Sequence, residues 1–382
     1  MVSSRLSAIS ESKTVASSNK AAEMVRNGRK IYNFGIGEPD FTTPENIIEA
    51  GFRWAREGKT HYTPSMGIPE LRDAISLKFK KFNRIEADPR DILVTPTKFS
   101  INLALMSILE SGDEVLLPEP YYVSYPDIIR LAGGKVIPVR TDENYAFDFY
   151  DMNKYLNPRT RALVFSNPTN PTGKVYSEKK LRELSDFILE NNLYLISDEI
   201  YEDIIFEGKA FSPASIPEMA DHTITVSGFS KSHAMTGWRI GYMTGPSDII
   251  RASNKIQQQT ITCASSIAQY AALEALRDEE SPKKMTQIFR ERRDLIYRLI
   301  SEGGSLKVRK PEGAFYIFPE FEGPADSETV SLELLDKEGV VVTPGSAFGM
   351  QGEKHLRISF AASNETITGG MERINSYFSN KR

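Results

Sequence analysis

Short apolar runs alternate with longer segments of helical length from about residue 90 to residue 245. The runs "DILVT", "EVLLP", "KVIPV", "RALVF", "LYLIS" and "TITVS" are rich in β-branched residues, whereas "KFSINLALMSILESG" and "EKKLRELSDFILENN" are long enough for helices. This alternation is typical of βαβ units. We therefore predict an α/β fold with a large domain, in which a mixed, mostly parallel sheet is covered by helices.

The segment "KFSINLALMSILESG" has hardly any polar face. Its apolar residues are Ile101, Leu103, Ala104, Leu105, Met106, Ile108 and Leu109. A helix that is apolar around most of its circumference is usually buried. We expect this helix to be deeply buried and its N-terminus to lie inside the molecule.

The pattern changes after the long charged segment "SPKKMTQIFRERRDLIYRLISEGG". Beyond it, "LKVRKPEGAFYIFPEF", "SLELLDKEGVVVTPGSAFG" and "KHLRISFAA" mix strand and helix character without the earlier rhythm. We predict a smaller α+β unit that this helix joins to the large domain. The serine-rich N-terminus contains Glu11 and lacks an arginine series, so we expect it to pack on the folded body rather than serve as a transit peptide.

Composition narrows the class of protein. The 382 residues are 40% hydrophobic and carry a net charge of only -4, which is typical of a globular enzyme and disfavours a nucleic-acid partner. Because Cys263 is the single cysteine, we expect no disulfide within the chain, no cysteine-based metal site and a reducing, cytoplasmic location. No apolar run approaches the roughly 18 residues of a membrane span, so no membrane partner is expected.

One lysine follows the predicted strand "TITVSGFS", at the kind of strand end where open α/β sheets bind ligands. Lys231 is either a solvated loop residue or a desolvated amine near other cations, which can attack a carbonyl. Arg239, Ser227 and Ser230 suit a phosphate, but an ion pair and turn caps explain them equally well. An imine-forming lysine beside a phosphate pocket suggests pyridoxal phosphate.

Other strand ends also carry polar residues. In "ILVTPTKFS", the hydroxyl of Thr97 and the backbone N–H of Lys98 begin a helix that can hold an anion. Asn167 and Asn170 each precede a proline, which either fixes the amide rigidly or makes an ordinary turn. Asp198 ends an apolar strand, where a carboxylate is costly unless a cation such as a protonated ring nitrogen meets it.

The ordered motifs "NPTG", "SDEIY" and "SGFSKSHAMTGWRIGY" closely resemble the class I and II aminotransferases of the aspartate aminotransferase family, which have fold type I. The segments "GIGEPDFTTP", "HYTPSMGIPELR", "GDEVLLPEPYYVSYP" and "LRISFA" agree with this resemblance, which covers almost the whole chain. It implies pyridoxal 5′-phosphate as cofactor and a homodimer with shared active sites. It also implies a large domain at residues 46–280 and a small domain built from residues 1–45 and 281–382.

The resemblance assigns roles around the cofactor ring. Lys231 matches the lysine that holds the cofactor and moves the substrate proton. Asp198 matches the aspartate that pairs with the ring nitrogen, and Tyr122 matches the stacking aromatic residue. Asn170 and Tyr201 match the residues that hydrogen-bond the ring oxygen O3′. Lys231, Asp198 and Tyr201 are the expected catalytic residues.

The resemblance also assigns the phosphate contacts. They are expected from Ser230, Arg239 and the helix start at Thr97 and Lys98, with Tyr62 reaching over from the second subunit. The loop "VTPTKFS" is shorter than in many members of the family and contains no glycine. A serine is also common three residues before the lysine. Gly228 stands there instead, so Ser227 or Ser230 is expected to replace its hydroxyl.

On the substrate side, Arg357 matches the arginine that binds the α-carboxylate. Gly37 is expected to let the backbone approach that carboxylate, and Asn170 also lies on the substrate side. The segment around Lys13 and Thr14 either covers the site and supplies a polar contact or forms a surface strand or turn.

The implied reaction is ping-pong transfer of an amino group between an L-amino acid and a 2-oxo acid. Aspartate with 2-oxoglutarate is the first expectation, although the segment "KIQQQTITCASSIAQ" has no arginine for a second carboxylate. Transfer from aromatic or other neutral amino acids and a fold-type I β-lyase remain alternatives. The sequence shows neither a helix-turn-helix region nor a basic excess, which disfavours a DNA-binding regulator of the same fold.

Overall fold

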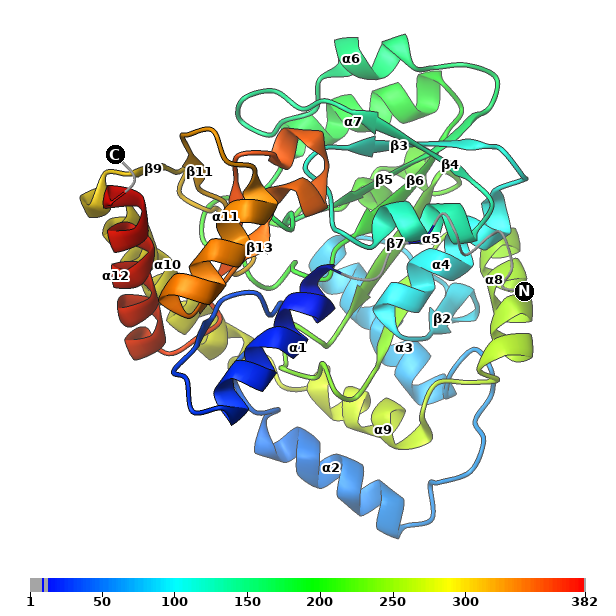
Figure 1. The fold of residues 1–382 in the computed structure, drawn as a ribbon. Coiled ribbons are helices and arrows are strands. Elements are labelled where there is room, and N and C mark those ends of the chain that lie inside the picture. Colours follow the sequence, from blue (N-terminus) through cyan, green and yellow to red (C-terminus); the bar gives the residue numbers. More distant parts are fainter. Residues whose placement is uncertain (1–8, 10–12, 381–382) are drawn as a thin grey trace, which may run out of the picture.

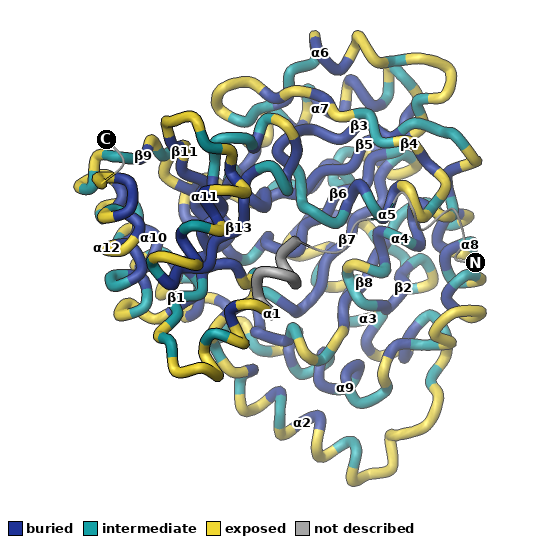
Figure 2. The backbone as a smooth tube through the Cα atoms, viewed as in Figure 1, coloured by how far each residue is buried: buried dark blue, intermediate teal, exposed yellow. Residues whose placement is uncertain are grey.

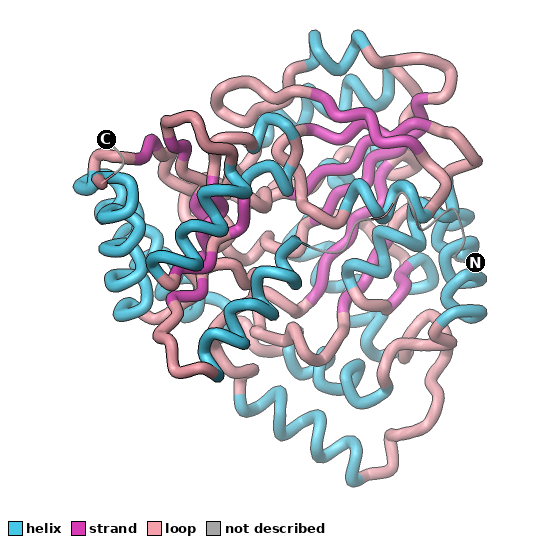
Figure 3. Tube along the Cα trace, viewed as in Figure 1, coloured by secondary structure: helices cyan, strands magenta, loops and turns pink. Residues whose placement is uncertain are grey.

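A mixed sheet forms the centre of the larger part of the protein. The computed structural model describes residue 9 and residues 13–380, and within them this sheet has seven strands in the order β2-β8-β7-β6-β5-β3-β4. Their bounds are β2 (Ile92–Val94), β3 (Glu114–Pro118), β4 (Lys135–Val139), β5 (Thr160–Ser166), β6 (Tyr194–Asp198), β7 (Thr223–Gly228) and β8 (Gly241–Thr244). Within the sheet β8 runs against its two neighbours and the other strands are parallel, as the sequence predicts (Figures 1 and 3).

Helices cover both faces of this sheet because the central strands are apolar on both sides. In β5, Ala162 and Val164 belong to one core cluster, and Leu163 and Phe165 belong to another. The first cluster includes residues of α4 (Thr97–Ile108), α5 (Tyr125–Leu131) and α8 (Ser247–Thr260). On the other side pack α7 (Glu178–Glu190) and, toward the β2 edge, α3 (Pro69–Lys78) and α9 (Ser266–Ala275). In Figure 2 the central strands β5, β6 and β7 are mostly dark blue, whereas the edge strand β4 is less buried.

The burial of α4 is close to what its composition predicts, with one exception. Ile101, Leu103 to Leu105 and Ile108 are buried, whereas Met106 is 45% exposed. The helix packs on the sheet and between α5 and α8, and no further layer of described residues covers its outer side at Met106. The expectation of deep burial is therefore wrong for Met106. The N-terminus of α4, at Thr97, opens on an internal cavity.

A second core joins the segment at residues 32–34 to the C-terminal part of the described chain. Its helices are α10 (Glu280–Gly303), α11 (Ser327–Glu333) and α12 (Asn364–Ser379). Its short strands are β1 (Tyr32–Asn33), β9 (Leu306–Lys307), β10 (Tyr316–Ile317), β11 (Glu320–Phe321), β12 (Val340–Val341), β13 (Thr343–Pro344) and β14 (Leu356–Ser359). Strand β1 pairs in parallel with β12, about 300 residues away in sequence. The division at residues 45 and 280 stays a prediction.

The other helices lie at the periphery: α1 (Lys13–Arg26), α2 (Glu45–Arg56) and α6 (Phe149–Lys154). Helix α1 packs through Ala21 against Leu335 and Val341, as expected for an N-terminal segment that lies on the body. It is a helix rather than the surface strand or turn considered above, and the side chains of Lys13 and Thr14 lie outside the described residues. None of the described helices combines the length and the apolar character that a membrane crossing needs.

Candidate active site

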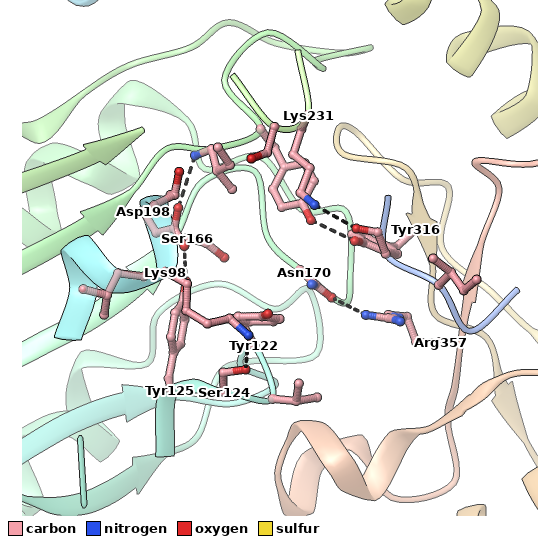
Figure 4. Close-up of a pocket in the computed structure, with 18 of the residues that line it drawn as sticks. Lys98, Tyr122, Ser124, Tyr125, Ser166, Asn170, Asp198, Lys231, Tyr316 and Arg357 are labelled. Atoms are coloured by element: carbon pink, nitrogen blue, oxygen red, sulfur yellow. Dashed lines mark hydrogen bonds between the residues drawn. The ribbon is translucent and has the colours of Figure 1, made fainter. Parts of the chain in front are cut away.

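A cavity of about 520 Å³ lies beyond the carboxyl ends of β5, β6 and β7 (Figure 4). This is the edge at which open α/β sheets bind ligands. The cavity brings together nearly all of the site residues expected from the sequence: Gly37, Thr97, Lys98, Tyr122, Asn170, Asp198, Tyr201, Ser230, Lys231, Arg239 and Arg357. Tyr62 does not line it and is 86% exposed.

Lys231 lies three residues beyond the end of β7, and its amine turns into the cavity. Its Nζ donates a hydrogen bond of 2.8 Å to the carbonyl oxygen of Gly37. Burial lowers the pKa of Lys231 to about 8, and the nearby positive charges of Arg239 and Arg357 act in the same direction. About a fifth of this amine is therefore neutral, and so nucleophilic, near pH 7.4, far more than for an ordinary lysine.

Asp198 is the last residue of β6, and its carboxylate is buried. The hydroxyl of Tyr125 donates to its Oδ2 at 2.8 Å, and the backbone N–H of Ile200 donates to its Oδ1 at 3.2 Å. Burial raises the pKa of Asp198 to about 6, although both hydrogen bonds favour the ionised form. Tyr125 is not among the site residues predicted from the sequence. Its position three residues after Tyr122 in "YYVSYP", at the start of a short helix, was the available signal.

Tyr201 contacts a second tyrosine, Tyr316, which is also not among the residues predicted from the sequence. The hydroxyl oxygens of Tyr201 and Tyr316 are 2.8 Å apart. Burial raises the pKa of Tyr316 to about 12 and that of Tyr201 well above its ordinary value, so both phenols keep their protons at neutral pH. No local sequence pattern predicts this pair of tyrosines, because 115 residues separate them.

Arg357 lies on β14 and is only 2% exposed. Its Nη2 donates to the carbonyl oxygen of Gly35 (2.6 Å) and to Oγ1 of Thr343 (3.1 Å), and its Nη1 donates to Oδ1 of Asn170 (3.3 Å). The guanidinium lies 4.6 Å from the ring centroid of Tyr316. Within the described residues Arg357 makes no salt bridge, and its buried Nε has no hydrogen-bond partner. A buried cation with only neutral partners is suited to an anionic ligand.

Close packing against Thr97, at the start of α4, explains why position 228 is a glycine. A Cβ added to Gly228 would lie 2.5 Å from Oγ1 of Thr97, and one added to Gly241 would lie 2.3 Å from the same atom. A serine therefore does not fit at position 228. Of the two serines expected to replace its hydroxyl, Ser230 lines the cavity. Ser227 does not line it, because its hydroxyl donates to Glu202 at 2.6 Å.

The remaining cations lie at the edge of the cavity. Arg239 has a positive φ of 54° and donates through Nη1 to the carbonyl oxygen of Thr236 at 2.8 Å. Lys98 is exposed at the start of α4. Its Nζ donates to the hydroxyl of Ser124 at 3.2 Å and lies 5.5 Å from the ring centroid of Tyr122. Both side chains have neutral partners here, which leaves their charge available to an anion.

Asn167 and Asn170 have different surroundings. Oδ1 of Asn167 accepts a hydrogen bond of 2.9 Å from the backbone N–H of Tyr176, so this residue stabilises its own turn. Asn170 lines the cavity and faces Arg357, as Figure 4 shows. Across the part of the chain that the structure describes, no group of three or more His, Cys, Asp or Glu side chains is arranged to hold a metal ion.

Comparison with known proteins gives consistent matches over nearly the full length. The family model "Aminotransferase class I and II" matches residues 29–374. The chain is 42% identical to a probable aspartate/prephenate aminotransferase of Aquifex aeolicus, with 98% of this chain and 97% of the relative covered. It is 43% identical to aromatic-amino-acid aminotransferase 2 of Thermococcus litoralis, with 92% of each covered. The structure of the Thermus thermophilus aspartate aminotransferase with maleate is similar, with a TM-score of 0.94, 40% identity and coverage of 98% and 99%.

Proposed function

The chain belongs to the class I and II aminotransferases, and on that premise we propose that it uses pyridoxal 5′-phosphate to move an amino group between an L-amino acid and a 2-oxo acid. Members of this family use that cofactor. L-Aspartate and 2-oxoglutarate are the first pair that we propose. The assignments of individual residues below are part of this proposal.

One observation carries the proposal: a single cavity holds three charged groups that make no salt bridge within the described residues. They are the amine of Lys231, the carboxylate of Asp198 and the guanidinium of Arg357. An amine of lowered pKa suits an aldehyde, a buried carboxylate suits a protonated ring nitrogen, and a buried guanidinium suits a carboxylate. The cofactor and an amino acid together offer all three complementary groups.

The chemistry divides between Lys231 and Asp198. When bound, the cofactor supplies an aldehyde that joins to amines and a protonated ring that accepts electrons. Asp198 would hold the proton on the ring nitrogen, and the hydrogen bond from Tyr125 orients its carboxylate. Lys231 would take the proton from the α-carbon of the substrate and deliver it to C4′ of the cofactor within the same half-reaction, and the second half-reaction would run this transfer in reverse. Because the pKa of Lys231 is lowered to about 8, its amine can act as this base near neutral pH.

The other residues hold the ring and the phosphate in place. Tyr122 would stack on the ring, and Asn170 and Tyr201 would hydrogen-bond its O3′. We propose that the phosphate lies at the start of α4. Its ligands there are the N-terminal N–H groups of the helix at Thr97 and Lys98, the hydroxyl of Ser230 and the guanidinium of Arg239. The close packing of Thr97 against Gly228 and Gly241 fixes this helix end.

Arg357 binds the α-carboxylate of the substrate, beside Asn170 and Gly37. The similar Thermus thermophilus structure contains maleate, a dicarboxylate, which supports an acidic substrate here. The side chain of Lys98 is the cation that we assign to a second carboxylate, because it is exposed at the cavity and bonds a neutral hydroxyl. The Thermococcus litoralis relative is named for aromatic amino acids, and the lining residues Ile36 and Ile200 give such side chains an apolar surface.

We further propose that the protein is a cytoplasmic homodimer whose active sites are shared. The support is Tyr62, an aromatic side chain that is 86% exposed and lies outside the cavity of its own subunit. Mixing Lys231→Ala protein with Tyr62→Ala protein tests the sharing of sites. Subunit exchange places both substitutions in one site of each mixed dimer and leaves the other site intact. We expect activity to rise above that of either variant alone, and no rise after complete exchange contradicts shared sites.

The function is tested with Lys231→Ala, for which the exposed Lys209→Ala is the matched control. We expect Lys231→Ala to lose the visible absorbance of the bound cofactor and nearly all transamination, whereas the control keeps both. Transamination at the unmodified rate in Lys231→Ala would remove this lysine from the mechanism.

A panel of amino donors without an acceptor separates transfer from β-elimination. Transfer predicts one equivalent of oxo acid per site, with aspartate among the fastest donors. Sustained release of pyruvate and ammonia would instead identify a β-lyase. A faster reaction with aromatic amino acids than with aspartate would move the substrate assignment to that class.

A further inference from the structure

Tyr316 lies between Tyr201, a proposed ligand of the cofactor, and Arg357, the proposed ligand of the substrate carboxylate. On one side its hydroxyl is 2.8 Å from that of Tyr201, and on the other its ring centroid is 4.6 Å from the guanidinium carbon of Arg357. The backbone of Gly37 packs directly on the Tyr316 hydroxyl, since a Cβ added there would lie 2.7 Å from that oxygen. Figure 4 shows Tyr316 next to Arg357 at the cavity.

The hydroxyl of Tyr316 is not needed to fill the core. The ring alone occupies the buried space, where it packs against Phe315 and Tyr201. A buried phenol oxygen without a partner is costly, and the partner here is a proposed cofactor ligand. The hydroxyl of Tyr316 therefore has its role at the site rather than in packing.

The direction of the hydrogen bond follows from the donors available, and this step rests on the proposed function. A tyrosine hydroxyl has one proton to donate. If Tyr201 donates that proton to the cofactor O3′, its oxygen must accept the proton of Tyr316. A hydroxyl that accepts a hydrogen bond becomes a stronger donor itself. The other charged or titratable groups that act on these two phenols are Arg357 and Tyr122.

We propose that Tyr316 is a positioning residue that serves both ligands of the site. Its hydroxyl strengthens the hydrogen bond from Tyr201 to the cofactor O3′, and its ring holds the guanidinium of Arg357 in place for the substrate carboxylate. The two roles belong to different parts of one side chain, so different substitutions separate them.

The experiment compares Tyr316→Phe, which removes only the hydroxyl, with Tyr316→Leu, which also removes the ring. Tyr176→Phe is the matched control, because Tyr176 is a buried tyrosine outside this cavity whose hydroxyl donates to a backbone carbonyl. The first measurement is a pH titration of the visible absorbance of each holoenzyme without substrate. The second is calorimetric binding of succinate, a dicarboxylate that cannot react.

For Tyr316→Phe we expect the proton-binding constant of the absorbing group to rise about twofold, because the hydrogen bond from Tyr201 to O3′ loses the roughly 10–30% strengthening that an accepted hydrogen bond gives it. Succinate binding should stay within about twofold, because the ring remains over Arg357. For Tyr316→Leu we expect succinate binding to weaken about tenfold or more, because the aromatic face is lost. The Tyr176→Phe control should match the unmodified enzyme in both measurements.

An absorbance titration of Tyr316→Phe that superimposes on that of the unmodified holoenzyme overturns the proposal. Equal weakening of succinate binding in the Phe and Leu variants also overturns it, because the ring would then have no separate role. If Tyr316→Leu does not fold, the titration of Tyr316→Phe decides alone. An unmodified protein that shows no cofactor absorbance at all refutes the proposed function itself, and this inference with it.

Discussion

Replacing Arg357 by methionine separates its role in binding from its role in stability. In most proteins the loss of one partner of a buried ion pair costs about 3 to 5 kcal/mol, because the other charge is left unpaired. Arg357 leaves no such charge behind, since its hydrogen-bond partners are the neutral oxygens of Gly35, Thr343 and Asn170. The substitution therefore tests whether this guanidinium is present for a ligand.

The expected change in stability is small because two opposing contributions are of similar size. Burying the guanidinium costs several kcal/mol. Its three hydrogen bonds to neutral groups, at about 1.5 to 3 kcal/mol each, offset that cost. Methionine fills most of the volume without a charge, so we expect the free energy of unfolding to change by less than about 2 kcal/mol. The midpoint of thermal unfolding should then shift by about 5 °C or less.

The expected loss of substrate binding is large. A fork of two charge-assisted hydrogen bonds to the α-carboxylate contributes about 3 to 6 kcal/mol, which corresponds to about 10² to 10⁴ in affinity. The assay follows the amino-donor half-reaction by absorbance over a range of donor concentrations, alongside circular dichroism melting. Arg357→Lys keeps the charge but loses the planar fork. Its affinity for the amino donor should therefore lie between that of Arg357→Met and that of the unmodified enzyme.

Two results would refute this reasoning. Donor affinity in Arg357→Met within about threefold of the unmodified enzyme would remove Arg357 from the substrate site. A loss of stability well above 3 kcal/mol, in the range of a broken buried ion pair, would show that the charge serves the fold.

Three further predictions concern the cofactor side. Incorporation of pyridoxal phosphate into apoenzyme should accelerate between pH 7 and pH 9, because the neutral amine of Lys231 forms as the pH passes about 8; a rate independent of pH contradicts this. In Tyr125→Phe, the pKa of Asp198 should rise above about 6, so the acid limb of kcat/KM should move to higher pH; an unchanged profile excludes this role. Gly228→Ser should lower the melting temperature and speed cofactor loss on dialysis, because its Cβ collides with Thr97; equal retention refutes the steric argument.

Much of the site could be predicted from the sequence because parallel strands place their carboxyl ends at one edge. Lys231, Asp198 and Asn170 each follow an apolar run, and the structure brings all three to one cavity. Arg357 differs, because its strand belongs to the second core. Only the resemblance identified it, since a strand-end arginine has no local pattern that points to a ligand.

The features that the sequence did not reveal depend on contacts between distant segments. Tyr316 lies on a strand of two residues and meets Tyr201 across 115 positions. The reason for glycine at position 228 is the hydroxyl of Thr97, which comes from a different strand end. Met106 was expected to be buried because composition reports the character of a helix but not which neighbours cover each side.

The pairing of β1 with β12 has a consequence for the order in which a newly made chain becomes competent. The main sheet is complete once residue 244 has been synthesised, and it already carries Lys231 and Asp198. Residues 32–33 cannot pair until residues 340–341 have left the ribosome, and Arg357, which we propose binds the substrate carboxylate, follows on β14. Translation proceeds at about 5 to 20 residues per second. The residues of the site on the main sheet are therefore present several seconds before the strand that carries Arg357. A nascent chain can therefore fold its sheet early but can bind an amino acid only near the end of its synthesis.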